Sequence, residues 1–144
     1  METTAPKNET VEPKPVKGGL VAYLQVDGAL KAAEFYKQAF GAEMAGYHPP
    51  DEQGRTMHVH VYINGSSLML SDAYPDHGYP HEKPQAFTVL LPLTSGDIDA
   101  WWKRAVDAGM EVTLDLQVMF WGDRYGQLRD PFGVAWAMNA PVNG

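Results

Sequence analysis

The stretch FYKQAFGA at residues 35–42 has a counterpart 66 positions later, WWKRAVDA at residues 101–108 (35 + 66 = 101). At the same offset, NGSSLML at residues 64–70 aligns with DPFGVAW at residues 130–136. An aromatic-aromatic-cation helix and a turn followed by a strand, both recurring at one offset, indicate two copies of one supersecondary unit. Two such units can enclose a pocket between them, so we expect the function to lie where the copies meet.

Hydrophobic periodicity predicts the same order of elements in both copies. In the first copy, a helix with alanines and aromatics at helical spacing begins after Asp27, its expected cap, and ends at Gly41. Asn64 and Gly65 predict a tight hairpin turn, because both central positions need positive φ. The predicted strands cover residues 19–26, 42–47, 56–63 and 67–71, then residues 85–91, 111–114, 125–129 and 134–138.

The predicted fold is therefore α+β, with two βαβββ modules that form curved mixed sheets around a cavity. Proline and glycine punctuate the chain between the modules. The expected segments are a disordered N-terminal tail (1–17), a first module (18–72), a linker (73–84), a second module (85–139) and a C-terminal tail (140–144).

Composition narrows the classes of function. The formal net charge of −7 and the absence of a basic run disfavour nucleic acid and anionic membranes as partners. No apolar run approaches the ~20 residues of a membrane span, and residues 1–17 lack the apolar segment of a signal peptide. Cysteine is absent, which fits a cytoplasmic protein and excludes disulfides and thiolate chemistry.

Two features resemble a known superfamily. The paired units, with AEFYKQAFG at residues 33–41 and DPFG at residues 130–133, resemble the vicinal-oxygen-chelate superfamily of glyoxalases, bleomycin-resistance proteins and dioxygenases. LMLSD at residues 68–72 and MFWGDRYG at residues 119–126 are closer to its PhnB-like subgroup. The resemblance covers residues 18–139 and implies the two-module fold.

The resemblance also implies four metal-ligand positions, one each on the first, fourth, fifth and eighth strands. These positions fall on Val21, on Met69 or Ser71, on Gln85 or Phe87, and on Ala137 or Ala135. Hydrocarbon side chains offer no oxygen or nitrogen to a divalent cation. We therefore expect no cofactor at this metal site.

Strand parity identifies candidate ligand-binding residues. Alternation places His58, His60 and Tyr62 on one strand face, and Tyr23 and Gln25 on the matching face of the first strand. A face that mixes polar and apolar groups is typical of a small-molecule cavity.

The glycine-flanked segment of residues 121–126 adds Trp121 and Arg124, an aromatic group and a guanidinium that could hold a planar or anionic ligand. An alternative is that Arg124 pairs with Asp123 and only braces the loop.

Three functions remain open at this point. The first is binding of a small organic molecule in a metal-free cavity by a homodimer, for sequestration or resistance. The second is a metal-dependent lyase or isomerase of the glyoxalase type, with one divalent metal ion on His58 and His60 and a third ligand from Asp72, Glu43 or His48. The third is a structural or regulatory role in binding a partner.

Overall fold

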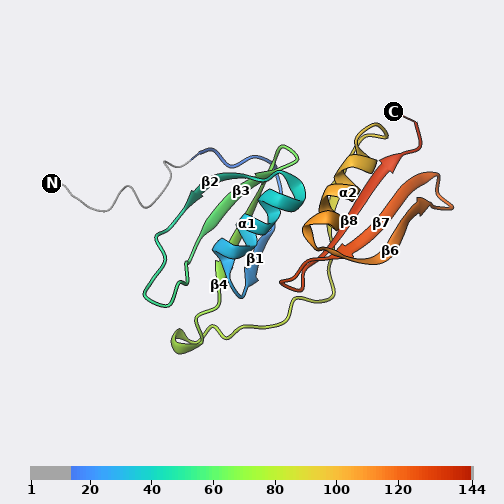
Figure 1. The fold of residues 1–144 in the computed structure, drawn as a ribbon. Helices are drawn as coiled ribbons and strands as arrows, with labels where there is room; N and C mark the ends of the chain where they lie inside the picture. The colour runs from blue at the N-terminus through green and yellow to red at the C-terminus, as the bar shows by residue number, and fades with distance from the viewer. Residues whose placement is uncertain (1–13, 144) are drawn as a thin grey trace. The chain divides into compact units, whose positions relative to one another are not determined.

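The computed structural model describes residues 14–143, so residues 1–13 of the predicted tail lie outside the described part. These described residues form two compact units. Residues 14–37 and 41–82 make up the first unit, and residues 38–40 and 83–143 the second. Each unit contains one four-stranded sheet with one helix across one of its faces (Figure 1). The two-module α+β fold predicted from the repeat is confirmed.

The first sheet has the strand order β1-β4-β3-β2. Its strands are β1 (Tyr23–Val26), β2 (Glu43–Tyr47), β3 (Val59–Ile63) and β4 (Ser66–Asp72). β1 runs parallel to β4, whereas β4 and β3, and β3 and β2, are antiparallel. The hairpin between β3 and β4 turns at Asn64 and Gly65, whose φ angles of 53° and 80° confirm the predicted turn.

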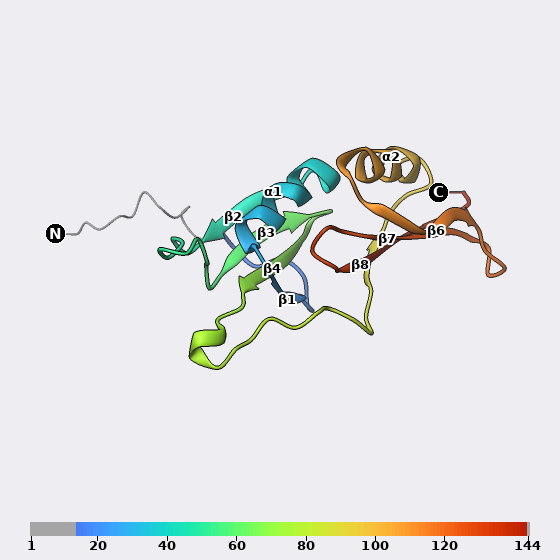
Figure 2. The ribbon, with the colours of Figure 1, turned by 60° about the horizontal axis from the view of Figure 1, so that its bottom comes forward.

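Helix α1 (Ala29–Phe40) covers one face of the first sheet (Figure 2). It ends at Gly41, which adopts a left-handed conformation and donates its N–H to Lys37 O. The side chains that this face buries include Leu24 and Val26 of β1 and Leu68 and Leu70 of β4. Burial of this apolar face holds helix and sheet together.

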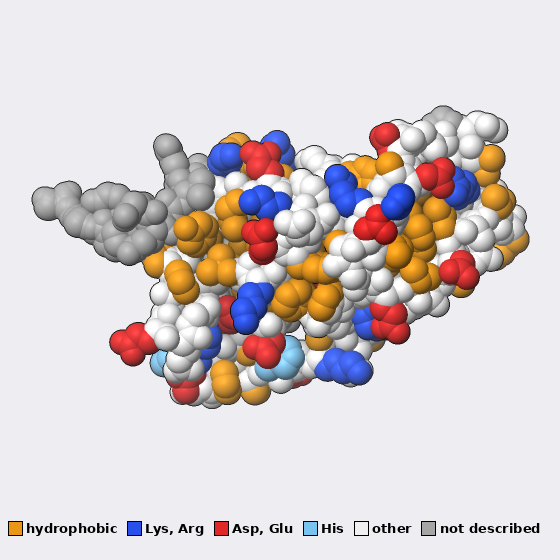
Figure 3. Space-filling model, in the orientation of Figure 1, with side chains coloured by type: hydrophobic (Ala, Val, Ile, Leu, Met, Phe, Trp, Pro, Cys, Tyr) orange, Lys and Arg blue, Asp and Glu red, His pale blue; other side chains and the backbone are white. Residues whose placement is uncertain are grey.

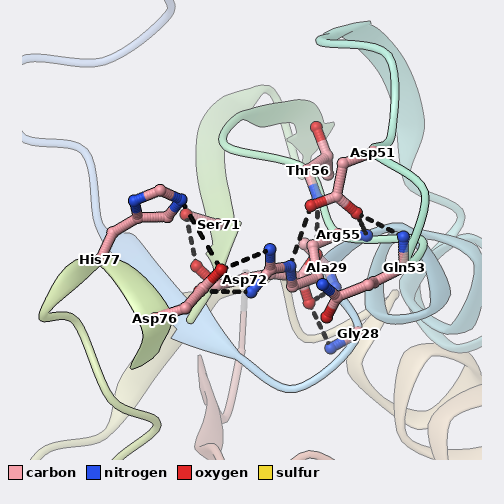
Figure 4. Close-up of polar contacts among 10 residues, drawn as sticks. All are labelled: Gly28, Ala29, Asp51, Gln53, Arg55, Thr56, Ser71, Asp72, Asp76 and His77. Atoms are coloured by element: carbon pink, nitrogen blue, oxygen red, sulfur yellow. Dashed lines mark hydrogen bonds and ion pairs between the residues drawn. The ribbon is translucent and has the colours of Figure 1, made fainter. Parts of the chain in front are cut away.

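The start of α1 is stabilised from a distance. The prediction that Asp27 caps the helix is wrong. Asp27 is exposed, and the N-cap position is occupied by Gly28, which has no side chain to accept from the helix amides. Instead Asp72, at the end of β4, accepts from the Gly28 N–H at 2.6 Å and the Ala29 N–H at 3.1 Å through one oxygen. Its other oxygen accepts from the Thr56 N–H at 2.9 Å (Figure 4). One carboxylate thus ties three segments of the first unit together.

A second polar cluster fixes the loop before β3. Arg55 donates to Asp51 at 2.9 Å and to Asp76 at 2.8 Å, and its guanidinium lies 4.5 Å from the centre of the Tyr74 ring (Figure 4). The two carboxylates raise the pKa of Arg55, and Arg55 lowers the pKa of Asp51 and of Asp76. The cluster joins the loop to the segment after β4 and has a structural role.

The second sheet has the order β5-β8-β7-β6, the same plan as the first. Its elements are β5 (Val89–Pro92), α2 (Ile98–Ala108), β6 (Glu111–Val118), β7 (Asp123–Arg129) and β8 (Ala135–Pro141). β5 begins four residues later than predicted (89 − 85 = 4), because Ala86 has a φ of 68°, which a strand does not accommodate. β6 extends to Val118, beyond the predicted end at residue 114, because it pairs with the full length of β7 through two irregularities.

No helix within residues 14–143 has the length and apolar character that a membrane span would need.

Candidate ligand-binding site

The face of the first sheet that α1 leaves uncovered gathers most of the predicted site residues. Tyr23 pairs with Met69 and Gln25 with Ser71, and Met69 lies opposite His60. Leu24, Leu68 and Leu70 alternate with these residues along β1 and β4 and are buried under the helix. The side chains of Tyr23, Gln25, Met69 and Ser71 therefore project from the opposite face of the sheet. We call this the open face; its side chains are Tyr23, Gln25, His58, His60, Tyr62, Ser67, Met69 and Ser71.

Tyr23 and His58 form a connected pair on the open face. The Tyr23 hydroxyl donates to Met57 O at 3.1 Å and lies 3.0 Å from His58 Nδ1. The hydroxyl has a single proton, so when it is donated to Met57 O, the contact with His58 requires a protonated Nδ1 that donates to Tyr23. In neutral His58 this leaves Nε2 as an acceptor, and no residue within 14–143 bonds to it.

Burial governs the charge of this pair. Desolvation, followed by repulsion from a charged His48, lowers the pKa of His58, so the neutral imidazole is favoured. Desolvation also raises the pKa of Tyr23, which keeps its phenol protonated at neutral pH. At pH 7 the pair therefore presents an uncharged aromatic surface with one free acceptor.

His60 and Tyr62 lie under another part of the chain. The Lys17 N–H donates to Ser67 Oγ at 2.8 Å, and Ser67 Oγ lies 2.6 Å from His60 Nε2. Ser67 Oγ accepts from Lys17 and can donate its hydroxyl proton to a neutral His60. Burial, and then repulsion from His58, lower the pKa of His60, which favours this neutral form. Tyr62 donates to Pro15 O, and the Lys17 ammonium lies 4.1 Å from the centre of the Tyr62 ring.

These contacts define a strap, residues 14–17, which is also held by an ion pair between Lys14 and Glu43 at 3.0 Å. Under the strap, His60 is 4% exposed and Tyr62 is 8% exposed, whereas Tyr23 is 54% exposed. The open face thus has an accessible part around Tyr23 and a covered part around His60.

The remaining predicted residues, Trp121 and Arg124, belong to the second unit. Arg124 donates to both carboxylate oxygens of Asp99 on α2, at 3.0 and 2.7 Å, and not to Asp123. Asp123 instead accepts from Asn139 at 3.1 Å. Arg124 is therefore engaged in a bidentate pair between strand and helix, and the alternative pairing of Arg124 with Asp123 is wrong.

Trp121 lies in the turn between β6 and β7 and packs edge-on against Tyr125, with ring centres 5.6 Å apart. Tyr125 pairs with Asn139, and Gln127 with Ala137. The side chain of Trp121 is about half exposed, so it stays available to a ligand. The predicted role of Trp121 stays a prediction.

Sequence reasoning missed Ser67 as a member of the open face. Its position opposite Tyr62 in the hairpin was the available signal. The contact with the strap could not be inferred, because residues 14–17 carry no periodic pattern.

The donor groups do not fit the metal site that the resemblance implies. The positions on β4 and β8 carry Met69 or Ser71 and Ala137 or Ala135, and the Ser71 hydroxyl donates to Asp72 O at 2.8 Å. Within residues 14–143 no group of three or more histidines and carboxylates could hold a metal ion. Of the three candidates for a third ligand beside His58 and His60, Asp72 bonds three backbone amides and Glu43 pairs with Lys14. The third candidate, His48, packs edge-on against His58 with ring centres 5.7 Å apart.

The sequence matches a known protein family and a curated relative. The model of the Glyoxalase/Bleomycin resistance protein/Dioxygenase superfamily matches residues 19–138. The protein Mb0911c of Mycobacterium bovis is 38% identical over 131 residues, which cover 88% of this chain and 86% of that protein.

Two solved structures have the same fold. The crystal structure of protein PA1353 from Pseudomonas aeruginosa has a TM-score of 0.69 and 28% identity, and covers 85% of this chain and 96% of its own. The PhnB protein from Bacillus cereus has a TM-score of 0.62 and 22% identity, and covers 85% of this chain and 99% of its own. The latter likeness shows the fold alone. On the family match and the shared fold, the chain belongs to the glyoxalase/bleomycin resistance protein/dioxygenase superfamily.

Proposed function

We propose that the protein binds a small organic molecule on the accessible part of the open face, without a metal ion. The observation that carries the proposal is the Tyr23–His58 pair, an exposed aromatic surface with an unengaged acceptor at His58 Nε2. Tyr23 is 54% exposed, so its ring offers an apolar surface directly beside a hydrogen-bonding imidazole. Gln25, Met69 and Ser71 border the pair and add polar and polarisable contacts.

The chemistry of the pair defines the ligand class. A neutral imidazole accepts a hydrogen bond from a hydroxyl or amide, and the tyrosine ring packs against an aromatic or apolar body. The ligand is therefore an uncharged or weakly charged amphiphile with at least one hydrogen-bond donor. The role fits sequestration of such a compound, as in the bleomycin-resistance proteins of this superfamily.

The test is a thermal-shift screen of uncharged aromatic amphiphiles, with phosphonates and glutathione adducts as charged comparison compounds, followed by titration of variants. Tyr23→Phe removes only the hydroxyl, and His58→Gln removes the imidazole acceptor. Tyr79→Phe is the matched control, because Tyr79 is an exposed tyrosine outside the open face. We expect hits to lose about three- to tenfold in affinity in the Tyr23 and His58 variants and to be unchanged in the control. Equal affinity in all four proteins would refute the site.

We also propose that the protein forms a homodimer. Phe120 in the β6–β7 turn is 96% exposed, and Val118, the last residue of the edge strand β6, is 63% exposed. Exposed apolar groups beside an open edge favour association with another chain. Light scattering should give twice the 15.9 kDa chain mass, and Phe120→Asp should shift it toward one chain mass. A single chain mass at micromolar concentration for the unaltered protein would refute the dimer.

A further inference from the structure

A hollow of the first unit lies on the helix side of the sheet, away from the open face. It has a volume of about 390 Å³ and lies between α1 and β2. Leu30 and Ala33 of α1, Met44 of β2 and Val61 of β3 contribute apolar walls. Figure 3 shows hydrophobic side chains exposed among charged ones over α1 and β2. We call this hollow the helix-side pocket; its size is within the range of ligand sites.

An irregularity in β2 shapes the pocket. The pairing with β3 shifts between Met44, opposite Val61, and Gly46, opposite His60. Tyr47 then lies opposite Val59. In a regular strand, residues 44 and 47 would project from opposite faces; the bulge turns both toward the helix side. Met44 and Tyr47 accordingly both line the pocket.

The bulge thereby brings a hydrogen-bonding group to an apolar pocket. The Tyr47 hydroxyl bonds to no residue within 14–143. Lys37 of α1 also lines the pocket. Its ammonium is 4.0 Å from Glu34, and both side chains are more than 60% exposed, so this pair is weak. The pocket therefore offers two available donors, a phenol and an ammonium, beside its apolar walls.

We propose that the helix-side pocket binds an amphiphilic monocarboxylate, such as a medium-chain fatty acid or an aryl carboxylate. The apolar body would lie against Leu30, Ala33 and Val61, and the carboxylate would accept from Lys37 and Tyr47. The pocket should bind an amine of the same shape more weakly than the carboxylate. Glu34 is the one carboxylate among its lining residues, and the Tyr47 phenol is a poorer acceptor than donor. The site is separate from the open face and does not depend on the function proposed there.

The test uses decanoate, at concentrations below micelle formation, with the full-length ¹⁵N-labelled protein. Decanoate should shift the amide signals of residues 33, 44, 47 and 61 in a saturable way. Lys37→Gln should weaken binding about three- to tenfold, and Tyr47→Phe about threefold. Lys31→Gln is the matched control, because Lys31 is an exposed lysine on the same helix that does not line the pocket. It should leave the affinity unchanged.

Two further measurements separate the possible results. Met44→Trp fills the pocket and should abolish binding, with circular dichroism to confirm folding. Decylamine should bind more weakly than decanoate. Decanoate shifts confined to residues 23, 25 and 58 would overturn the helix-side pocket while supporting the open face. Equal loss in the Lys37 and Lys31 variants, or tighter binding of decylamine, would also overturn it.

Discussion

Replacement of Asp72 by asparagine should destabilise the first unit more than any other change of one charged group to its amide. Asp72 is 5% exposed, and its carboxylate accepts from the N–H groups of Gly28, Ala29 and Thr56. Asparagine keeps one oxygen for Gly28 and Ala29 but turns an NH₂ group toward the Thr56 N–H. One buried donor then loses its acceptor, which costs about 1–3 kcal/mol.

A second contribution comes from charge. A carboxylate at the start of α1 interacts favourably with the helix dipole, and its loss costs about 0.3–1 kcal/mol. Together the two effects predict a loss of roughly 1–4 kcal/mol in the free energy of unfolding. Asp72→Ala leaves all three amides without a partner and should cost more than Asp72→Asn.

The assay is urea unfolding followed by tryptophan fluorescence and circular dichroism. Hydrogen exchange should show faster exchange of the Thr56 amide in Asp72→Asn. The control is Asp27→Asn, because Asp27 immediately precedes the N-cap but is exposed and bonds to none of the helix amides in the described chain. Its effect should stay within about 0.5 kcal/mol. An unchanged midpoint in the Asp72 variant, or an equal loss in the Asp27 variant, would refute the reasoning.

Three further changes test other parts of the fold. Gly126→Ala would place a Cβ 2.5 Å from the Trp102 ring and should cost about 2 kcal/mol of unfolding free energy in urea, partly recovered by adding Trp102→Leu. Gly65→Ala meets no atom within 4 Å but has a φ of 80°, so it should cost only about 1 kcal/mol, and a larger loss would contradict a purely backbone origin. Burial lowers the pKa of His58 and His60 in the folded protein, so the unfolded chain binds more protons near its pKa of about 6.5. The free energy of unfolding should therefore be highest above that pH and fall as the pH drops through it. Urea midpoints measured from pH 8 to 5 test this, and the double variant His58→Gln/His60→Gln should show a flatter pH dependence. A stability that rises as the pH falls would contradict the lowered pKa values.

Local patterns made most of the fold predictable. The helix stop at Gly41 and the turn at Asn64 and Gly65 depend on residues that favour left-handed backbone, and such preferences are visible in the sequence. Alternation in the predicted strands at residues 19–26 and 56–63 placed Tyr23, His58 and His60 on matching faces, because side-chain direction in a strand follows parity. The sequence repeat allowed the order of elements in the second unit to be predicted from that of the first.

The failures share a physical cause, which is interaction between residues far apart in the chain. Asp27 has the usual position of a helix cap, yet Asp72, 45 residues later (72 − 27 = 45), takes the amides because the end of β4 lies beside the start of α1. Arg124 reaches Asp99 on a helix 25 residues earlier and not its neighbour Asp123. The bulge that turns Tyr47 into the helix-side pocket depends on pairing with β3 and has no marker in β2 itself.

The strap divides the open face into a part that is covered and a part that is accessible to solvent. His60 and Tyr62 are buried beneath residues 14–17, and their polar atoms bond to Ser67 and Pro15. With the strap in place, His60 is 4% and Tyr62 8% exposed, so their predicted contact with a ligand would require the strap to move. Tyr23 and His58 have the opposite combination, exposed aromatic surface and an unengaged acceptor. The ligand binding that we propose for this face would therefore use the part near β1, and the residues under the strap would stabilise the face.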